Sequence, residues 1–208
     1  LVIAGGAHQQ PEPGMYGAEP PYLPLAARPD VLVFETEPLV EDIEVTGPVD
    51  VTLWVSSSAL DTDFTAKLLD IYPPNADYPS GYHLNLTDSI IRARYRDGFD
   101  RGVPMEPGAA YRVQIDMPPT SNLFKMGHRI RVDIASSSFP KFDVNPNTGE
   151  PVGRHTHTMK ARNTVYLDRK RPSHVVLPVI PGQPDGDPHA DSPRAVERMN
   201  PVTGAGLP

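Results

Sequence analysis

Apolar and polar residues alternate along three segments in the middle of the chain, residues 49–55, 111–117 and 129–134. Within each segment every second residue is apolar, and most of the residues between are charged or polar. A period of two places one set of side chains in a core and the other in water or against a partner, which predicts half-buried β-strands. The apolar sets are Val49, Val51, Leu53 and Val55, then Tyr111, Val113, Ile115 and Met117, and finally Ile130, Val132 and Ile134.

Three further segments extend the strand pattern. Phe64–Tyr72 is apolar on both faces, so we expect a strand that is central in its sheet or covered on both sides. His83–Arg96 is a longer candidate, and His174–Ile180 supplies a closing strand. Turn sequences such as Thr46-Gly47-Pro48 separate these segments. About eight strands and no strong helix predict an all-β fold, either a two-sheet sandwich or a jelly roll.

Proline and glycine delimit this β-sandwich. The chain has 26 Pro and 16 Gly among 208 residues, which favours short elements joined by turns over long helices. We expect an extended arm over residues 1–30, the sandwich over 31–180, and a flexible tail over 181–208 with a short helical turn around Ala195–Met199. The opening residues, Leu1-Val-Ile-Ala-Gly-Gly6, have the character of an interior segment, so we expect a further part of the protein to precede them.

Charge and cysteine content narrow the function. A formal net charge of −7 disfavours nucleic acid or an anionic membrane as a partner. The sequence contains no apolar run near the roughly 20 residues that a membrane span needs. With no Cys, the chain has no disulfides, no thiol catalysis and no cysteine-based zinc site, which fits a reducing cytoplasm. We predict no cofactor and no metal.

The sequence lacks the nucleophile motif of an α/β-hydrolase. That motif, Gly-x-Ser-x-Gly, holds a serine on a strained turn between a strand and a helix, and no such pentapeptide is present. Two serine runs, Ser56–Ser58 and Ser136–Ser138, each follow a strand pattern, and we interpret them as residues that close strand ends through local hydrogen bonds.

Asp61 and Asp63 lie two residues apart in a predicted turn, just before Phe64. Such carboxylates can cap the turn, form an interdomain contact, or bind calcium. The stretch offers fewer oxygen ligands than calcium loops usually have, so capping or an interdomain contact is the favoured interpretation.

Three other features carry alternative interpretations. Arg92, Arg94 and Arg96 alternate along one predicted strand face, which suits phosphate binding or, in better agreement with the acidic chain, a solvated or interdomain salt-bridged face. Trp54 lies on the polar face of its strand, where it either packs against a neighbouring element or stacks on a sugar. His155-Thr-His157 has the spacing of a metal site on a strand, but its polar surroundings favour a surface loop.

Several stretches, in order from about Arg28 to Ile180, together resemble one family. The resemblance is carried by Arg28–Phe34 (RPDVLVF), Glu44–Val49 (EVTGPV), Asp61–Leu68 (DTDFTAKL), Ile91–Arg96 (IRARYR), Gly127–Arg131 (GHRIR), Ser136–Asp143 (SSSFPKFD), Asn145–Gly149 (NPNTG) and Pro172–Pro178 (PSHVVLP). The chain is similar to the C-terminal domain of the serine hydrolases that include X-Pro dipeptidyl-peptidase, cocaine esterase and α-amino-acid ester hydrolase.

This resemblance implies a galactose-binding-like jelly roll that is not catalytic by itself. Its implied partner is an α/β-hydrolase domain upstream in the same chain, which carries a Ser-His-Asp triad and acts on an ester or peptide substrate. The domain would pack on that partner and help to wall its pocket, with Leu1, Val2 and Ile3 near the substrate. Structural or interdomain contacts are expected of Asp61, Asp63, Phe64, Arg92, Arg94 and Trp54.

Other functions remain open. The main alternative is a stand-alone carbohydrate- or ligand-binding jelly roll, and a weaker one is a metal-dependent enzyme that uses His155 and His157. A homodimer is also open.

Overall fold

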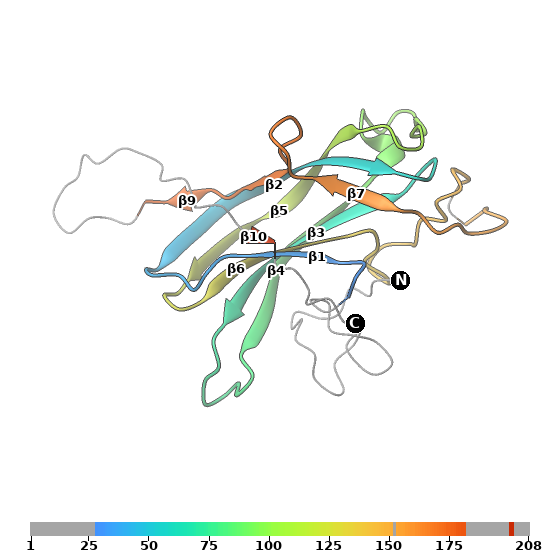
Figure 1. The fold of residues 1–208 in the computed structure, drawn as a ribbon. Coiled ribbons are helices and arrows are strands. Elements are labelled where there is room, and N and C mark those ends of the chain that lie inside the picture. Colours follow the sequence, from blue (N-terminus) through green and yellow to red (C-terminus); the bar gives the residue numbers. More distant parts are fainter. Residues whose placement is uncertain (1–27, 152, 182–199, 202–208) are drawn as a thin grey trace.

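Each alternating segment of the sequence forms a strand in the computed structural model, which describes residues 28–151, 153–181 and 200–201 (Figure 1). The elements are β1 (Leu32–Glu35), β2 (Ile43–Ser57), β3 (Asp63–Tyr72), β4 (Tyr82–Arg92), a 3₁₀ turn η2 (Ala93–Tyr95), β5 (Tyr111–Phe124), β6 (Arg129–Ala135), β7 (Asn163–Tyr166), β8 (His174–Val176), β9 (Val179–Ile180) and β10 (Asn200–Pro201). The predicted all-β class is therefore confirmed, and the strands form the two sheets of a sandwich. The finer assignment, a jelly roll, stays a prediction.

The first sheet has the strand order β10-β1-β6-β3-β4, and every neighbouring pair is antiparallel. In the second sheet β2 is the common strand. Because β2 is 15 residues long, its residues from Ile43 to Val55 can pair with β5 on one side, while β9, β8 and β7 pair in turn along the other side.

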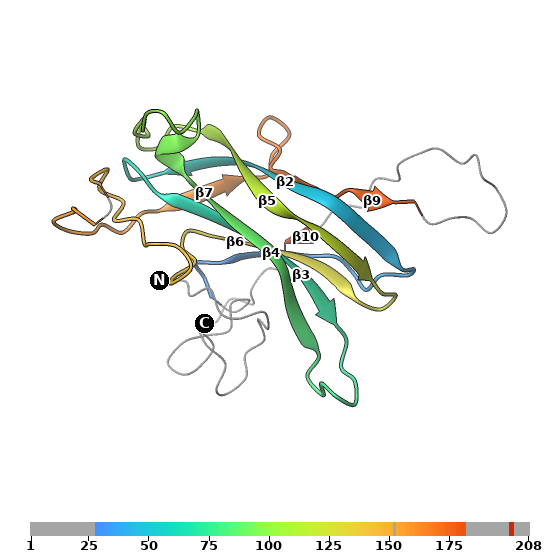
Figure 2. The same ribbon diagram turned by 180° about the vertical axis from the view of Figure 1, so that it is seen from behind.

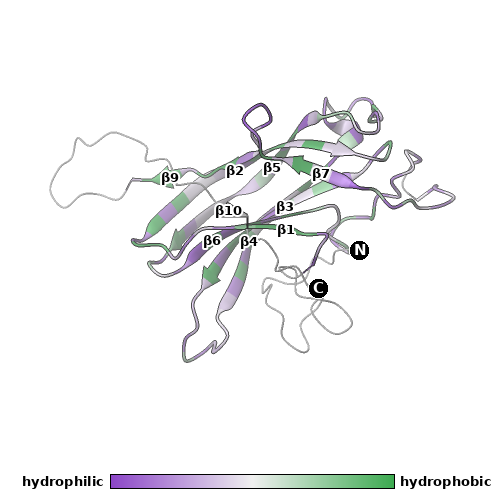
Figure 3. Ribbon diagram, in the orientation of Figure 1, coloured by the Kyte–Doolittle hydropathy of each residue, from purple (hydrophilic) through white to green (hydrophobic). Residues whose placement is uncertain are grey.

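The core lies between the inner faces of the two sheets, where the predicted apolar sets meet. Val49, Val51 and Val55 of β2 are fully buried, as are Leu68 of β3 and Ile130 of β6. Figure 3 shows the corresponding alternation of apolar and polar residues along the strands. Burial of alternate side chains fixes the register, because a shift of one residue would expose the whole apolar set.

The double-sided burial predicted for the segment Phe64–Tyr72 is confirmed. β3 lies between β6 and β4, and nine of its ten residues are buried. Its outer face is not purely apolar, since Lys67 is buried there beside a second strand that buries the ion pair Arg131–Asp133. The outer face of the first sheet therefore buries charged as well as apolar side chains.

The prediction of one strand from His83 to Arg96 is wrong at its C-terminal end. β4 stops at Arg92, and the chain turns through η2, so Arg94 and Arg96 do not continue the strand face. The cause lies in the segment that leads into β3, about 30 residues earlier in the sequence. There the Asp61 carboxylate accepts the Arg94 backbone N–H at 2.9 Å, so this N–H is not available to a neighbouring strand.

Two other strands differ from the sequence prediction. β7 forms within the polar segment 138–173, for which no strand is predicted from the sequence. The closing strand is divided into β8 and β9 around Pro178, which has no N–H to donate to the sheet. Opposite this break, the Pro178 ring lies 3.0 Å from the point where a side chain on Gly47 would begin, so the proline fits against a glycine.

No helix in the described part of the chain is long and apolar enough to cross a membrane. Most of the predicted arm (residues 1–27), the helical turn at Ala195–Met199 and the rest of the tail, apart from residues 181 and 200–201, lie outside the described residues.

Candidate functional site

Asp61 and Asp63 lie in a buried network of ion pairs at one end of the sandwich. Both side chains are almost completely removed from solvent. Asp61 accepts the Arg94 guanidinium at 2.6 Å, and Asp63 accepts Arg92 through two bonds of 2.9 and 3.0 Å. The two carboxylates therefore anchor the chain on either side of the point where β4 ends.

Asn145 joins the two ion pairs. Its side-chain amide donates to Asp61 and to Asp63, each at 2.8 Å, and its carbonyl oxygen accepts the backbone N–H of Asn147. Asn147 has a φ of 64°, a left-handed conformation that asparagine tolerates better than most residues. The network therefore fixes the Asn145–Gly149 loop against β3 and β4.

Burial affects the protonation of Asp63. Desolvation raises the pKa of Asp63 above the ordinary aspartate value, and the hydrogen bonds from Arg92 and Asn145 oppose that shift. The hydrogen bond between Arg92 and Asp63 also raises the pKa of Arg92, which keeps the guanidinium charged. Since the donors that surround Asp61 and Asp63 are guanidinium and amide groups, their oxygens are directed at protein donors rather than at a cation site, and the calcium alternative gains no support.

Arg96 and Trp54 both lie outside the network around Asp61 and Asp63. The Arg96 guanidinium stacks over the ring of Tyr111 at 4.3 Å and donates to the carbonyl oxygens of Ala93 and Val103. It therefore shares no ion pair with the carboxylates that bind Arg92 and Arg94. Trp54 lies on the outer face of β2, directly between Arg112 of β5 and Tyr166 of β7.

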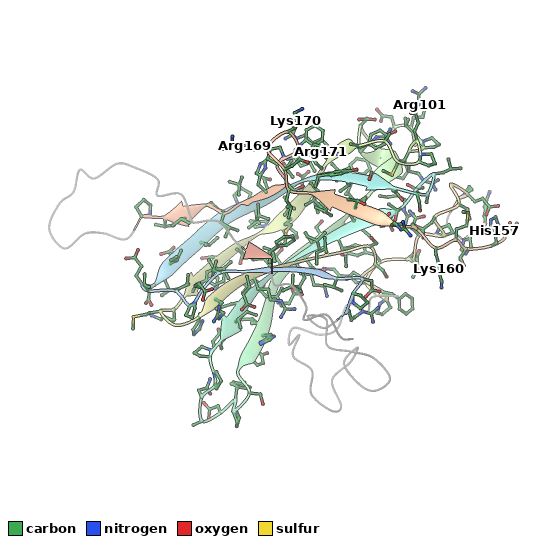
Figure 4. All side chains as sticks on the ribbon, in the orientation of Figure 1. Arg101, His157, Lys160, Arg169, Lys170 and Arg171 are labelled. Carbon is green, nitrogen blue, oxygen red and sulfur yellow. The ribbon has the colours of Figure 1, made fainter. Side chains whose placement is uncertain are left out.

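Tyr166 is a second aromatic residue next to Trp54, but the Tyr166 ring already contacts other side chains. The Arg171 guanidinium lies 3.5 Å from the centre of that ring, and the Tyr166 hydroxyl is 2.9 Å from the Ser56 hydroxyl. Figure 4 shows Arg171 with Arg169 and Lys170 on the loop that follows β7. These contacts favour packing over sugar stacking for this face.

A second buried polar cluster, not predicted from the sequence, lies around Asp70. His128 Nδ1 lies 2.8 Å from the carboxylate of Asp70, which also accepts Asn122 at 3.1 Å. Asp70 is fully buried and occupies the inner-face position that follows Leu68 by two residues. An aspartate at an expected core position was the signal that could have identified this cluster from the sequence.

The serine runs engage in one local and two long-range hydrogen bonds. The Ser57 hydroxyl accepts the backbone N–H of Ala59, the Ser58 hydroxyl accepts that of Arg162, and the Ser136 hydroxyl accepts the side-chain amide of Asn163. The Ser57 bond is local, as the interpretation expects, whereas the other two join residues that are 104 and 27 positions apart.

His155 and His157 lie in a loop, where the period-two geometry of a strand does not hold (Figure 4 labels His157). His157 lies 3.6 Å from Glu150, and in the described residues no group of three or more His, Cys, Asp or Glu side chains is arranged to hold a metal ion. Leu1, Val2 and Ile3, predicted near the substrate, lie outside the described residues.

Known proteins share this framework. The family model described as the X-Pro dipeptidyl-peptidase C-terminal non-catalytic domain matches residues 6–176. The chain is 46% identical over 159 residues to the cocaine esterase of Rhodococcus sp. (strain MB1 Bresler), an alignment that covers 76% of this chain and 27% of the esterase.

Solved structures agree. An α-amino acid ester hydrolase superposes with a TM-score of 0.70 at 38% identity, over 74% of this chain and 26% of that one. An aminopeptidase from a marine sediment archaeon, Thaumarchaeota archaeon, superposes with a TM-score of 0.71 at 34% identity, over 75% of this chain and 27% of that one. The chain thus spans about a quarter of the length of the relatives it matches.

Proposed function

Because the chain belongs to the X-Pro dipeptidyl-peptidase C-terminal non-catalytic domain family, we propose that it is the accessory domain of a serine hydrolase and packs on an α/β-hydrolase domain upstream in the same protein. The observation that carries this proposal is the family match over residues 6–176, taken with the small share of each relative that the chain covers.

The chemistry of the chain supports an accessory role. A serine hydrolase needs a serine hydroxyl, a histidine that takes its proton and a carboxylate that orients the histidine. The sequence has no Gly-x-Ser-x-Gly motif. The buried pair Asp70–His128 has two of the three groups, but the ring of His128 packs against Tyr72 at 4.2 Å.

The reaction of the whole protein is acyl transfer through an activated serine. An acyl-enzyme forms on the upstream domain and water then hydrolyses it. The named relatives act as an esterase, an amino acid ester hydrolase and an aminopeptidase, so we propose an ester or amide of an acyl or aminoacyl group as the substrate class.

This chain contributes a rigid wall to that reaction. Pockets between domains exclude water and hold the substrate in position, which requires that the wall keep its shape. The buried network around Asp61 and Asp63 and the core between the sheets supply that rigidity. Leu1, Val2 and Ile3 are the proposed contacts with the acyl group, and a reducing cytoplasm is the proposed location because the sequence has no Cys.

Native mass and active-site labelling test this function. An antibody to this segment should detect a protein several times heavier than 22.7 kDa in the source cells, and a fluorophosphonate probe should label it. The 208-residue chain alone, as the matched control, should not react with the probe. A native mass near 22.7 kDa without labelling would overturn the proposal and favour a stand-alone binding module, while twice the subunit mass would reveal a homodimer.

A further inference from the structure

One end of the sandwich exposes large apolar side chains beside a projecting hairpin. We call it the hairpin end, and define it by residues 36–44, 72–82 and 122–129. The turn between β3 and β4 extends away from both sheets (Figure 2). Val40 and Met126 are 88% and 67% exposed, and Tyr78 at the hairpin tip and Leu123 are each close to half exposed.

A continuous row of aromatic rings connects the hairpin tip to the body of the domain. The Tyr78 and Tyr82 ring centres are 4.6 Å apart, those of Tyr82 and Tyr72 are 5.8 Å apart, and Tyr72 lies 4.2 Å from His128. Aromatic residues contribute large contact area for little loss of side-chain freedom, and they are enriched in protein interfaces.

The hairpin tip is held in one conformation. The side-chain oxygen of Asn75 accepts the backbone N–H groups of Asp77 and Tyr78, and the Asn75 N–H donates to the Tyr78 carbonyl. Gly81 has a φ of 82° and no room for a side chain, since a Cβ there would lie 2.6 Å from the Tyr72 carbonyl oxygen.

The adjoining turn is fixed as well. Asp42 accepts the Lys125 ammonium at 2.8 Å and the Met126 backbone N–H at 2.7 Å, which couples the exposed Met126 to the segment that carries Val40. The buried pair Asp70–His128 also anchors this turn to β3. A surface that is already ordered loses little entropy when it binds, so this end is prepared for a contact.

The charge around these apolar groups is negative. The three segments contain five carboxylates, Glu37, Glu41, Asp42, Glu44 and Asp77, against the two cations Lys125 and Arg129. Asp42 pairs with Lys125 and Glu37 with Arg129, so the surplus is three negative charges. A complementary partner would therefore present an apolar patch with lysine or arginine at its edge.

Resting on the proposed accessory function, we propose that the hairpin end is the surface that docks on the hydrolase part of the same protein. Tyr78, Met126 and Val40 enter an apolar patch of that part, and the surplus negative charge of the hairpin end faces its basic residues. About three quarters of each relative lies outside the region that this chain matches, so a partner within the same protein is at hand for every copy.

The opposite end of the sandwich provides the control. Phe99 is 81% exposed in the loop after η2, which makes it an aromatic residue as accessible as Val40 but far along the strands from the hairpin. Its ring lies 6.1 Å from that of Tyr95, and no larger aromatic row extends from it in the described residues.

Photo-crosslinking in the full-length protein tests this assignment. Benzoylphenylalanine is placed at Tyr78, at Met126 or at Phe99, the protein is irradiated, and crosslinked peptides are mapped by mass spectrometry. The three positions are exposed, so each variant should fold, and circular dichroism verifies this. We expect crosslinks to residues upstream of this segment from positions 78 and 126, at least tenfold more abundant than from position 99.

Three results would overturn the inference, and they differ in what they say about the proposed function. Crosslinks to the upstream part from position 99 alone would leave the accessory role intact and move the docking surface to the opposite end. Crosslinks that join two copies of the protein from position 78 would make the hairpin end a self-association surface. A full-length protein without any upstream hydrolase part would remove both the docking partner and the proposed function.

Discussion

Replacement of Asp61 by alanine should be among the most damaging single changes in this domain. The Asp61 carboxylate is fully buried and accepts three hydrogen bonds, from the Arg94 backbone N–H at 2.9 Å, the Arg94 guanidinium at 2.6 Å and the Asn145 amide at 2.8 Å. Removal of one partner of a buried ion pair leaves the other charge uncompensated, which costs about 3–5 kcal/mol. That loss is a large part of the roughly 5–15 kcal/mol that stabilises a typical domain.

Urea unfolding measures this loss directly. Trp54 is the only tryptophan and lies on β2, so its fluorescence reports on the second sheet while the mutation lies at the start of β3. With a slope of about 2–3 kcal/mol per molar urea, the Asp61→Ala midpoint should fall by roughly 1–2 M. Lys125→Ala, which removes a half-exposed cation of a surface ion pair, should leave the midpoint unchanged.

A second variant separates charge from packing. In Asp61→Ala/Arg94→Met the uncompensated guanidinium is gone and the apolar stem remains, so part of the lost stability should return. If Asp61→Ala shifted the midpoint no more than Lys125→Ala does, the buried network would not hold the end of β4, and the explanation given for the turn at η2 would be wrong.

Three further predictions concern the hairpin, the outer face of β3 and Trp54. Gly81→Ala should lower the free energy of unfolding by at least about 1 kcal/mol more than Gly108→Ala, because both glycines have a φ of 82° but only a Cβ at Gly81 meets a carbonyl oxygen, at 2.6 Å; equal losses would contradict a clash at the hairpin. Burial lowers the pKa of Lys67, so at pH values below this lowered pKa the buried charge reduces the free energy of unfolding, and the reduction disappears as the pH rises towards the unfolded pKa of 10.5. The free energy of unfolding of the wild type, relative to that of Lys67→Met, should therefore increase between pH 8 and 11. A difference between the two proteins that stays constant with pH in urea titrations would refute this prediction. Trp54→Ala should lower the thermal midpoint, because Trp54 lies opposite Arg112 and Tyr166 on the two neighbouring strands. Calorimetry should detect no sugar binding to the wild type; binding that the variant loses would contradict a packing role.

Much of the fold follows from local pattern. A period of two in β2, β5 and β6 predicted both the strands and their buried faces, since only one register hides every apolar side chain. The double-sided apolar character of β3 likewise predicted its central place. By contrast β7 has four residues in a polar region, and such a short strand forms only because the edge of β2 offers hydrogen bonds that no sequence window contains.

In the candidate site, too, the sequence predicted the individual residues but not the contacts between them. Asp61, Asp63, Arg92 and Arg94 were singled out from the sequence as structural or interdomain residues, but their pairing was not, because it depends on contacts between residues about 30 positions apart. The interpretation of Arg92, Arg94 and Arg96 as one strand face failed because a carboxylate from another segment ends the strand.

The sequence by itself determined the all-β class, the main strands and the likeness to a non-catalytic hydrolase domain, since these depend on the order and spacing of residues along the chain. Tertiary structure alone decided which charges are buried together, where β4 ends, and that Tyr72, Tyr78, Tyr82 and His128 form one aromatic row. Burial and ion pairing act between residues that are close in space, and residues far apart in the sequence come close only when the sheets form.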